Sequence, residues 1–139
     1  MATKLPAFED LDDNYSSLPD PQRIIREINP KYADNDEIKN TCVLRISQAL
    51  NACPGHEIPK LDYLYTIVGT NGKRYALRVK EMKQYMTARY GAPLVLNATA
   101  KGVIDNTPII KQRGIIAFDV AGWDDASGHF TLWDGEQLE

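Results

Sequence analysis

Apolar residues recur with the period of an α-helix over residues 42–50. They stand at positions i, i+4, i+7 and i+8, on one helical face, and are Cys42, Ile46, Ala49 and Leu50. The acidic run at residues 34–37 supplies N-cap and first-turn acids, so the helix is predicted to begin either there or at Asn40-Thr41. With either start, Cys42 faces inward, toward whatever packs on the helix.

The middle of the chain predicts a β-hairpin followed by a second helix. Residues 63–68 and 73–77 favour strands, and Asn71-Gly72 between them favours a hairpin turn because these two residues tolerate a positive φ. Residues 79–90 predict a helix that Gly91 ends. The inward residues of this helix are expected to be Met82, Tyr85, Met86 and Tyr90.

Two further strands are predicted toward the C-terminus. Residues 114–120 form the most apolar segment and predict a central strand, and residues 129–133 predict the strand after it. Asp134-Gly135 favours another hairpin turn. The segment that precedes these strands is ambiguous, with a weak strand pattern at residues 94–96.

The N-terminal residues differ in composition from the rest of the chain. Residues 1–22 are rich in Asp, Glu, Pro and Ser, so we expect an extended arm draped on the domain or a partly ordered tail. Residues 23–139 are expected to form one domain of ordinary size. That domain opens with Ile24, Ile25 and Ile28 in a short helix or turn.

Composition and charge narrow the class of protein. The chain is 43% hydrophobic and 25% charged, as in a globular protein, and its net charge of −3 gives no electrostatic reason to expect nucleic acid as a partner. No apolar run approaches the length of a membrane span, so we expect no membrane insertion. Residues 1–6 lack the apolar region of a signal peptide, so we expect synthesis in the cytosol and export by a route other than general secretion.

The cysteines are not expected to form a disulfide or to bind metal. An unbroken helix from Cys42 to Cys53 would separate them by roughly 16 Å, whereas a disulfide needs Cα atoms about 4.4–6.8 Å apart. Cys53 and His56 resemble half of a zinc site, but the sequence offers no second ligand pair at suitable spacing. We therefore predict no metal and no cofactor, and expect His56 to be solvated.

Cys42 and His129 suggest thiol chemistry. The start of a helix carries partial positive charge and unpaired N–H groups, which favour a thiolate and can hold an oxyanion. A histidine at the start of a later strand can act as general base and then as general acid. A cysteine on an apolar helix face is more often an inert core residue, so the spacing alone does not decide the matter.

With these elements placed, the chain resembles the type VI secretion amidase effectors, specifically their fourth family, within the NlpC-like branch of papain-fold peptidases. The resemblance is carried by residues 40–51 (NTCVLRISQALN), 114–118 (GIIAF), Gly122-Trp123 and 127–135 (SGHFTLWDG). Residues 72–75 and 90–93 also resemble family positions. It covers residues 24 to 135 in the family's order. It implies an α+β, papain-like cysteine peptidase fold in which the helix bearing Cys42 packs on an antiparallel sheet bearing His129.

The resemblance also implies a function. Such effectors are bacterial toxins that hydrolyse the amide between γ-D-glutamate and meso-diaminopimelate in peptidoglycan stem peptides. The type VI secretion apparatus injects them, without a signal peptide, from the producer's cytoplasm into the periplasm of a competitor. A cognate immunity protein blocks the active site. By this resemblance Cys42 is the nucleophile and His129 the base.

The third catalytic residue departs from the family pattern. The family places an Asp on the strand after the histidine strand, beyond residue 139, so the domain is expected to lack its last strand. Asp134 lies nearer and is a candidate for the residue that orients the imidazole. Trp123 and Gly128 are candidates for the substrate groove. Trp133 also flanks His129 and could line the groove, but packing in the core is expected at least as often for it.

Two rival functions use the same fold. The Cys–His pair could transfer an acyl group to an amine instead of water, and the sequence does not fix the acceptor. A catalytically impaired module could instead use the groove to hold a peptide without cleaving it.

Overall fold

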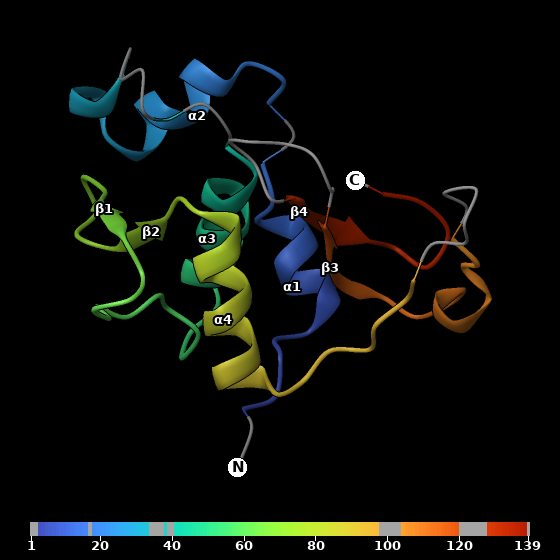
Figure 1. Cartoon of the computed structure of the whole chain (residues 1–139). Coiled ribbons are helices and arrows are strands. Elements are labelled where there is room, and N and C mark those ends of the chain that lie inside the picture. The colour runs from blue at the N-terminus through green and yellow to red at the C-terminus, as the bar shows by residue number, and fades with distance from the viewer. Residues whose placement is uncertain are drawn as a thin grey trace.

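The computed structural model describes residues 3–16, 18–33, 38, 41–97, 104–119 and 128–138. Its helices are α1 (Phe8–Asp13), α2 (Pro21–Ile28), α3 (Cys42–Asn51) and α4 (Val79–Tyr90), with 3₁₀ turns η1 (Pro30–Tyr32) and η2 (Thr107–Ile109). Its strands are β1 (Thr66–Val68), β2 (Arg74–Ala76), β3 (Gly114–Asp119) and β4 (Gly128–Trp133). Figure 1 shows α3 and α4 in the middle, with β1–β2 on one side and β3–β4 on the other. This is the α+β arrangement that the sequence predicts.

Helix α3 begins at the second of the two predicted starts. Thr41 is the N-cap, and its carbonyl accepts the first helical hydrogen bond from the Arg45 N–H at 3.0 Å. The alternative start at residues 34–37 lies outside the described residues. The predicted inward face is confirmed, because Cys42, Ile46, Ala49 and Leu50 are all buried.

The hydrophobic core has two parts that meet at α3. The larger part joins α3 to Met82 and Tyr85 of α4 and to Phe130 and Leu132 of β4. The smaller part, beneath α2, receives Leu44 from α3. Burial on more than one side fixes α3 as the scaffold on which the other elements pack.

The strands form two separate two-stranded sheets among the described residues. β1 pairs with β2, and β3 pairs with β4, both antiparallel. The prediction of a central strand at residues 114–120 is wrong for the described part of that strand, which has a neighbour on one side. Ile115 and Ile116 are only half buried and Ala117 is exposed, because β4 is the one described strand beside them.

The first hairpin is shorter than predicted. Residues 61–64 form a turn closed by a bridge between Leu61 and Leu64, and the Tyr65 N–H donates to the Glu81 carboxylate at 2.8 Å. The backbone groups of residues 61–65 therefore have partners outside the hairpin, and the strand begins only at Thr66. The predicted turn is confirmed, and Gly72 has a φ of 80° within it.

The N-terminal segment is not an extended arm over residues 8–13. It forms α1, whose Leu11 is 1% exposed and belongs to the main core. Phe8 and Tyr15 pack against the same core. Phe8, Leu11 and Tyr15 follow a helical period in the sequence, which the abundance of acidic residues obscured.

The remaining predictions have mixed outcomes. Helix α4 has the predicted bounds and ends at Gly91, with a φ of 95°. The weak strand pattern at residues 94–96 does not form a strand, and Leu94 is 69% exposed. After β4 the chain turns at Asp134-Gly135 as predicted, and Leu138 bridges back to Trp133.

Candidate active site

Cys42 is the first residue of α3, where the helix presents its positive end. The N–H groups of the first turn have no partner within the helix, so this end favours an anion. The side chain is only 3% exposed and packs in the main core. The predicted position of the thiol at a helix start is confirmed.

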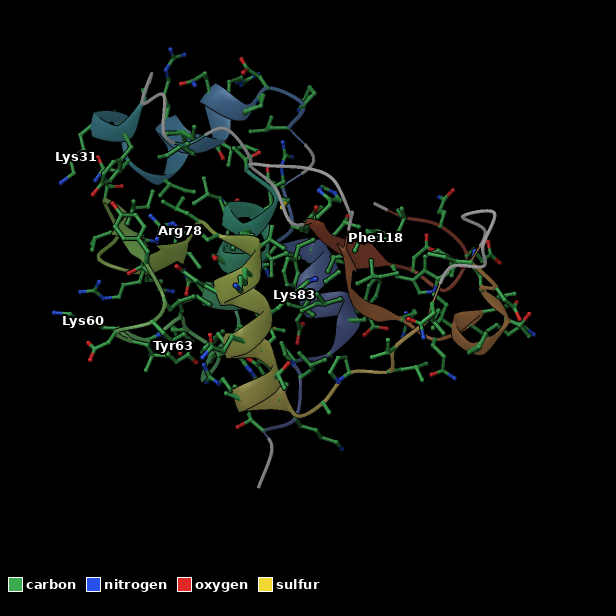
Figure 2. All side chains as sticks on the ribbon, viewed as in Figure 1. Lys31, Lys60, Tyr63, Arg78, Lys83 and Phe118 are labelled. Carbon is green, nitrogen blue, oxygen red and sulfur yellow. The ribbon has the colours of Figure 1, made fainter. Side chains whose placement is uncertain are left out.

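His129 is the second residue of β4, and part of its surface is exposed to solvent while the rest is covered. It pairs across the sheet with Phe118 of β3, which Figure 2 labels beside β4. Phe130 and Leu132 follow it and enter the core cluster that also contains Cys42. β4 is thus anchored against α3, and the histidine lies at its N-terminal end.

Arg45 links the start of α3 to the segment after α1. Its side chain runs back along α3 toward the helix start, as helical side chains do, and Nε donates to Thr41 Oγ1 at 3.4 Å. Its Nη1 donates to the Ser16 carbonyl at 3.0 Å, which ties the segment after α1 to the same place. The guanidinium is therefore beside the residue that precedes Cys42.

The charge of Arg45 also reaches His129. Partial burial lowers the pKa of His129, and the positive charge of Arg45 lowers it further. Both effects disfavour the imidazolium form. At neutral pH the imidazole is neutral and able to accept a proton.

The segment after α1 contacts β4 as well as α3. The Tyr15 hydroxyl lies 3.2 Å from Thr131 Oγ1, two residues along the strand from His129. Thr131 is 1% exposed. Residues 15–16 therefore contact both α3 and β4.

Asp134 is not brought to His129. Asp134 follows His129 by five positions, which is roughly 16 Å along extended backbone. Asp134 Oδ1 accepts hydrogen bonds from the N–H groups of Glu136 and Gln137, both at 2.8 Å, and these bonds lower the pKa of the carboxyl group. Its carboxylate stabilises the turn after β4, so the geometry corrects the expectation that it orients the imidazole.

The substrate-groove candidates are only partly covered by the structure. Gly128 is the first residue of β4 and pairs with Asp119, directly before His129. Trp123 lies outside the described residues. Within the described chain, no hydrogen bond or ion pair joins the His129 side chain to a carboxylate.

Cys53 and His56 have structural surroundings. The two cysteines are not joined in a disulfide, as predicted. Cys53 Sγ donates to the Ala49 carbonyl, and burial together with the charges of Asp10 and Glu57 raises the pKa of its thiol. His56 is not simply solvated, because its Nδ1 lies 2.9 Å from the Tyr90 hydroxyl and the two rings stack.

The described ranges contain neither a cluster of metal-binding side chains nor a helix suited to spanning a membrane. No group of three or more His, Cys, Asp or Glu side chains there could hold a metal ion. No helix there is long and apolar enough to cross a membrane.

Sequence reasoning gave no role to Arg45, although it lies within the motif around Cys42. The spacing of Arg45 could have predicted its contact with Thr41, because Arg45 follows Thr41 by four residues and so lies on the same helical face. No local sequence pattern could have predicted the contacts of residues 15–16 with Arg45 and Thr131, since these contacts join segments far apart in the chain.

Replacing Arg45 with glutamine is expected to raise the pKa of His129, because one of the two effects that lower it disappears. Burial and Arg45 are the two causes of the lowered pKa, and the charged residues of α4, which also packs on β4, are not among them. These residues are Lys80, Glu81, Lys83 and Arg89. Titration of the His129 ring protons by NMR measures the change. The imidazolium should persist to higher pH in the variant, and an unchanged or lower pKa would contradict the assignment.

Arg78→Gln is the matched control for that titration. Arg78 pairs with Glu81 at 3.2 Å and lies over the Tyr65 ring, near β1 and β2 in Figure 2. Its replacement should leave the His129 titration where it was.

Comparison with known proteins identifies close structural relatives. A family model for type VI secretion system amidase effector protein 4 (Tae4) matches residues 38–139. No curated protein sequence matches significantly.

Solved structures of that kind superpose on most of the chain. The Tae4–Tai4 effector–immunity complex from Enterobacter cloacae gives a TM-score of 0.84 at 28% identity, covering 96% of this chain and 83% of that chain. Tae4 alone from the same organism gives 0.84 at 27% identity, covering 99% and 86%. The Tae4–Tai4 complex from Salmonella Typhimurium gives 0.76 at 28% identity, covering 97% and 86%.

Proposed function

The chain belongs to the Tae4 family of type VI secretion amidase effectors, with their papain-like fold, and from this premise we propose that it hydrolyses the γ-D-glutamyl–meso-diaminopimelate amide of peptidoglycan stem peptides through Cys42 and His129. The observation that carries the proposal is the placement of Cys42 at the N-terminus of α3, against the strand that begins with Gly128-His129. No metal or cofactor is required by this chemistry.

The first half of the reaction forms a thioester. The Cys42 thiol gives its proton to the neutral imidazole of His129, and Sγ attacks the γ-carbonyl carbon of D-glutamate. N–H groups at the start of α3 stabilise the negative oxygen that forms. The C–N bond then breaks as the imidazolium returns the proton to the nitrogen of diaminopimelate.

The second half releases the acid. His129 takes a proton from water, and the resulting hydroxide attacks the thioester carbon. The C–S bond breaks, and the proton on His129 returns to Sγ. The lowered pKa of His129 supports this role, because a neutral imidazole is the form that accepts the proton in both steps.

The imidazole has no carboxylate partner among the described residues. Loss of an orienting carboxylate reduces the rate of a catalytic Cys–His or Ser–His pair but does not remove its chemistry. We therefore propose a two-residue site in the described chain, without Asp134.

Delivery and inhibition follow from the family. We propose that the type VI apparatus carries the protein from the cytoplasm of the producer to the periplasm of the target cell. We also propose a cognate immunity protein, by analogy with the Tae4–Tai4 complexes from Enterobacter cloacae and Salmonella Typhimurium.

A second candidate is a catalytically impaired module that binds stem peptides on the same fold. The observation that favours it is the His129 imidazole, which lacks a carboxylate partner within the described ranges. It differs from the first candidate in one measurable respect, the chemical state of the substrate after incubation.

Mass spectrometry of digested peptidoglycan distinguishes these functions. Hydrolysis should give new D-glutamate carboxyl ends and diaminopimelate amino ends, with 18O entering the carboxyl group when the digest is run in H₂18O. Acyl transfer would join the D-glutamyl carbonyl to an added amine, and a binding module would leave the stem peptides intact. Cleavage at a different bond would reject the proposed substrate bond.

A further inference from the structure

Arg45 has hydrogen-bonding capacity that its contacts within the chain do not use. A guanidinium carries five N–H donors. In Arg45 one of them donates to Thr41 Oγ1 and another donates to the Ser16 carbonyl. The other donors have no partner among the described residues. The side chain is half buried, so the group is held in place yet reachable.

The two contacts also fix where this positive charge lies. Thr41 is the N-cap of α3 and Cys42 is the next residue, so the Nε contact keeps the guanidinium at the start of the helix, beside the residue that precedes Cys42. The contact with Ser16 holds it from a second element. A pre-oriented guanidinium binds a carboxylate better than a mobile one, because less side-chain entropy is lost.

The proposed substrate presents a carboxylate at a matching distance. In a γ-linked D-glutamate, the α-carboxylate lies on the acyl side of the scissile bond, four carbon–carbon bonds from the γ-carbonyl, or about 5 Å in an extended chain. Arg45 follows Cys42 by three residues, or about 4.5 Å of helical rise. A γ-carbonyl placed at Cys42 thus brings the α-carboxylate within reach of the guanidinium.

We propose that Arg45 is the specificity-determining residue that binds the free α-carboxylate of the γ-D-glutamyl residue. The inference rests on the proposed function and deepens it, because it limits the substrate class to stem peptides with D-glutamate. Stem peptides with D-isoglutamine, in which a neutral amide replaces that carboxylate, are then poor substrates. The charge of Arg45 also lowers the pKa of His129, which agrees with a guanidinium that lies near the start of α3 and the start of β4.

The test compares two stem peptides that differ only in D-glutamate or D-isoglutamine. The unaltered protein should favour the D-glutamate peptide in kcat/KM by roughly tenfold or more, the factor expected for a hydrogen bond to a charged group. Arg45→Gln should lose this preference, and Arg45→Lys should keep part of it because the charge remains. Arg78→Gln should keep all of it. An undiminished preference in Arg45→Gln would overturn the inference.

A binding measurement decides the inference without cleavage. Calorimetry on Cys42→Ala should show tighter binding of the D-glutamate peptide, and adding Arg45→Gln should equalise the two peptides. Equal binding to Cys42→Ala itself would overturn the inference. If the unaltered protein cleaves neither peptide while the binding preference is present, the proposed function fails and the carboxylate site stands. Thermal melts of each variant show whether the fold is kept, and Arg45→Lys provides the comparison if Arg45→Gln does not fold.

Discussion

Cys42→Ala is expected to abolish cleavage of stem peptides, with a loss in kcat of roughly 10³-fold or more. Alanine keeps the helix and the small buried volume but removes the nucleophile, so no thioester can form. The rate is measured by chromatography of released peptides at saturating substrate. Persistent cleavage by Cys42→Ala, at matched purity, would remove the thiol mechanism.

His129→Ala should cause a comparable loss because the two residues act as a unit. The double variant should then be no slower than either single variant. Cys53→Ala is the matched control, since Cys53 donates to the Ala49 carbonyl at the far end of α3 and takes no part in the proposed chemistry. Full activity in Cys53→Ala shows that loss of a buried thiol is not in itself harmful.

Leu11→Ala is expected to lower the free energy of unfolding by about 2–5 kcal/mol, the range for truncating a buried leucine. Leu11 is 1% exposed in the main core, so its loss leaves a cavity against α3. Urea unfolding followed by circular dichroism measures the change. Activity should also fall at temperatures where the protein is still folded. The reason is that α1 leads directly into Tyr15 and Ser16, which contact Thr131 and Arg45.

Leu5→Ala is the matched control for that experiment. Leu5 lies before α1 and is 42% exposed, so the same chemical change there should cost little. If Leu11→Ala were no more destabilising than Leu5→Ala, residues 8–13 would be an arm on the domain, as the composition alone suggested.

The helical half of the fold could be predicted from the sequence because its patterns are local. The period at Cys42, Ile46, Ala49 and Leu50 needs only one helix to be recognised, and Gly91 ends α4 by its own backbone preference. The sheets were harder to predict. An apolar run such as residues 114–118 does not say how many strands lie beside it, and β3 has one described partner.

The candidate site shows the same division. Cys42 and His129 each stand at the start of a regular element, so their positions followed from pattern and resemblance. The expected role of Asp134 as the residue that orients the imidazole was not met, because the N–H groups of Glu136 and Gln137 donate to its carboxylate. The contacts of Arg45 and Tyr15 join α3 and β4 to residues 15–16, and no local pattern reports such long-range pairs.

Alkylation of Cys42 during catalysis tests the central claim most directly. The protein is treated with iodoacetamide, and the remaining amidase activity and the modified fraction of each cysteine are followed by peptide mapping in one time course. Cys42 should react before Cys53, whose pKa is raised by burial and by the charges of Asp10 and Glu57. Activity should fall in step with the fraction of Cys42 that is modified, reaching zero at one equivalent. Cleavage that continues with Cys42 fully alkylated, or activity that tracks Cys53 instead, would contradict the account.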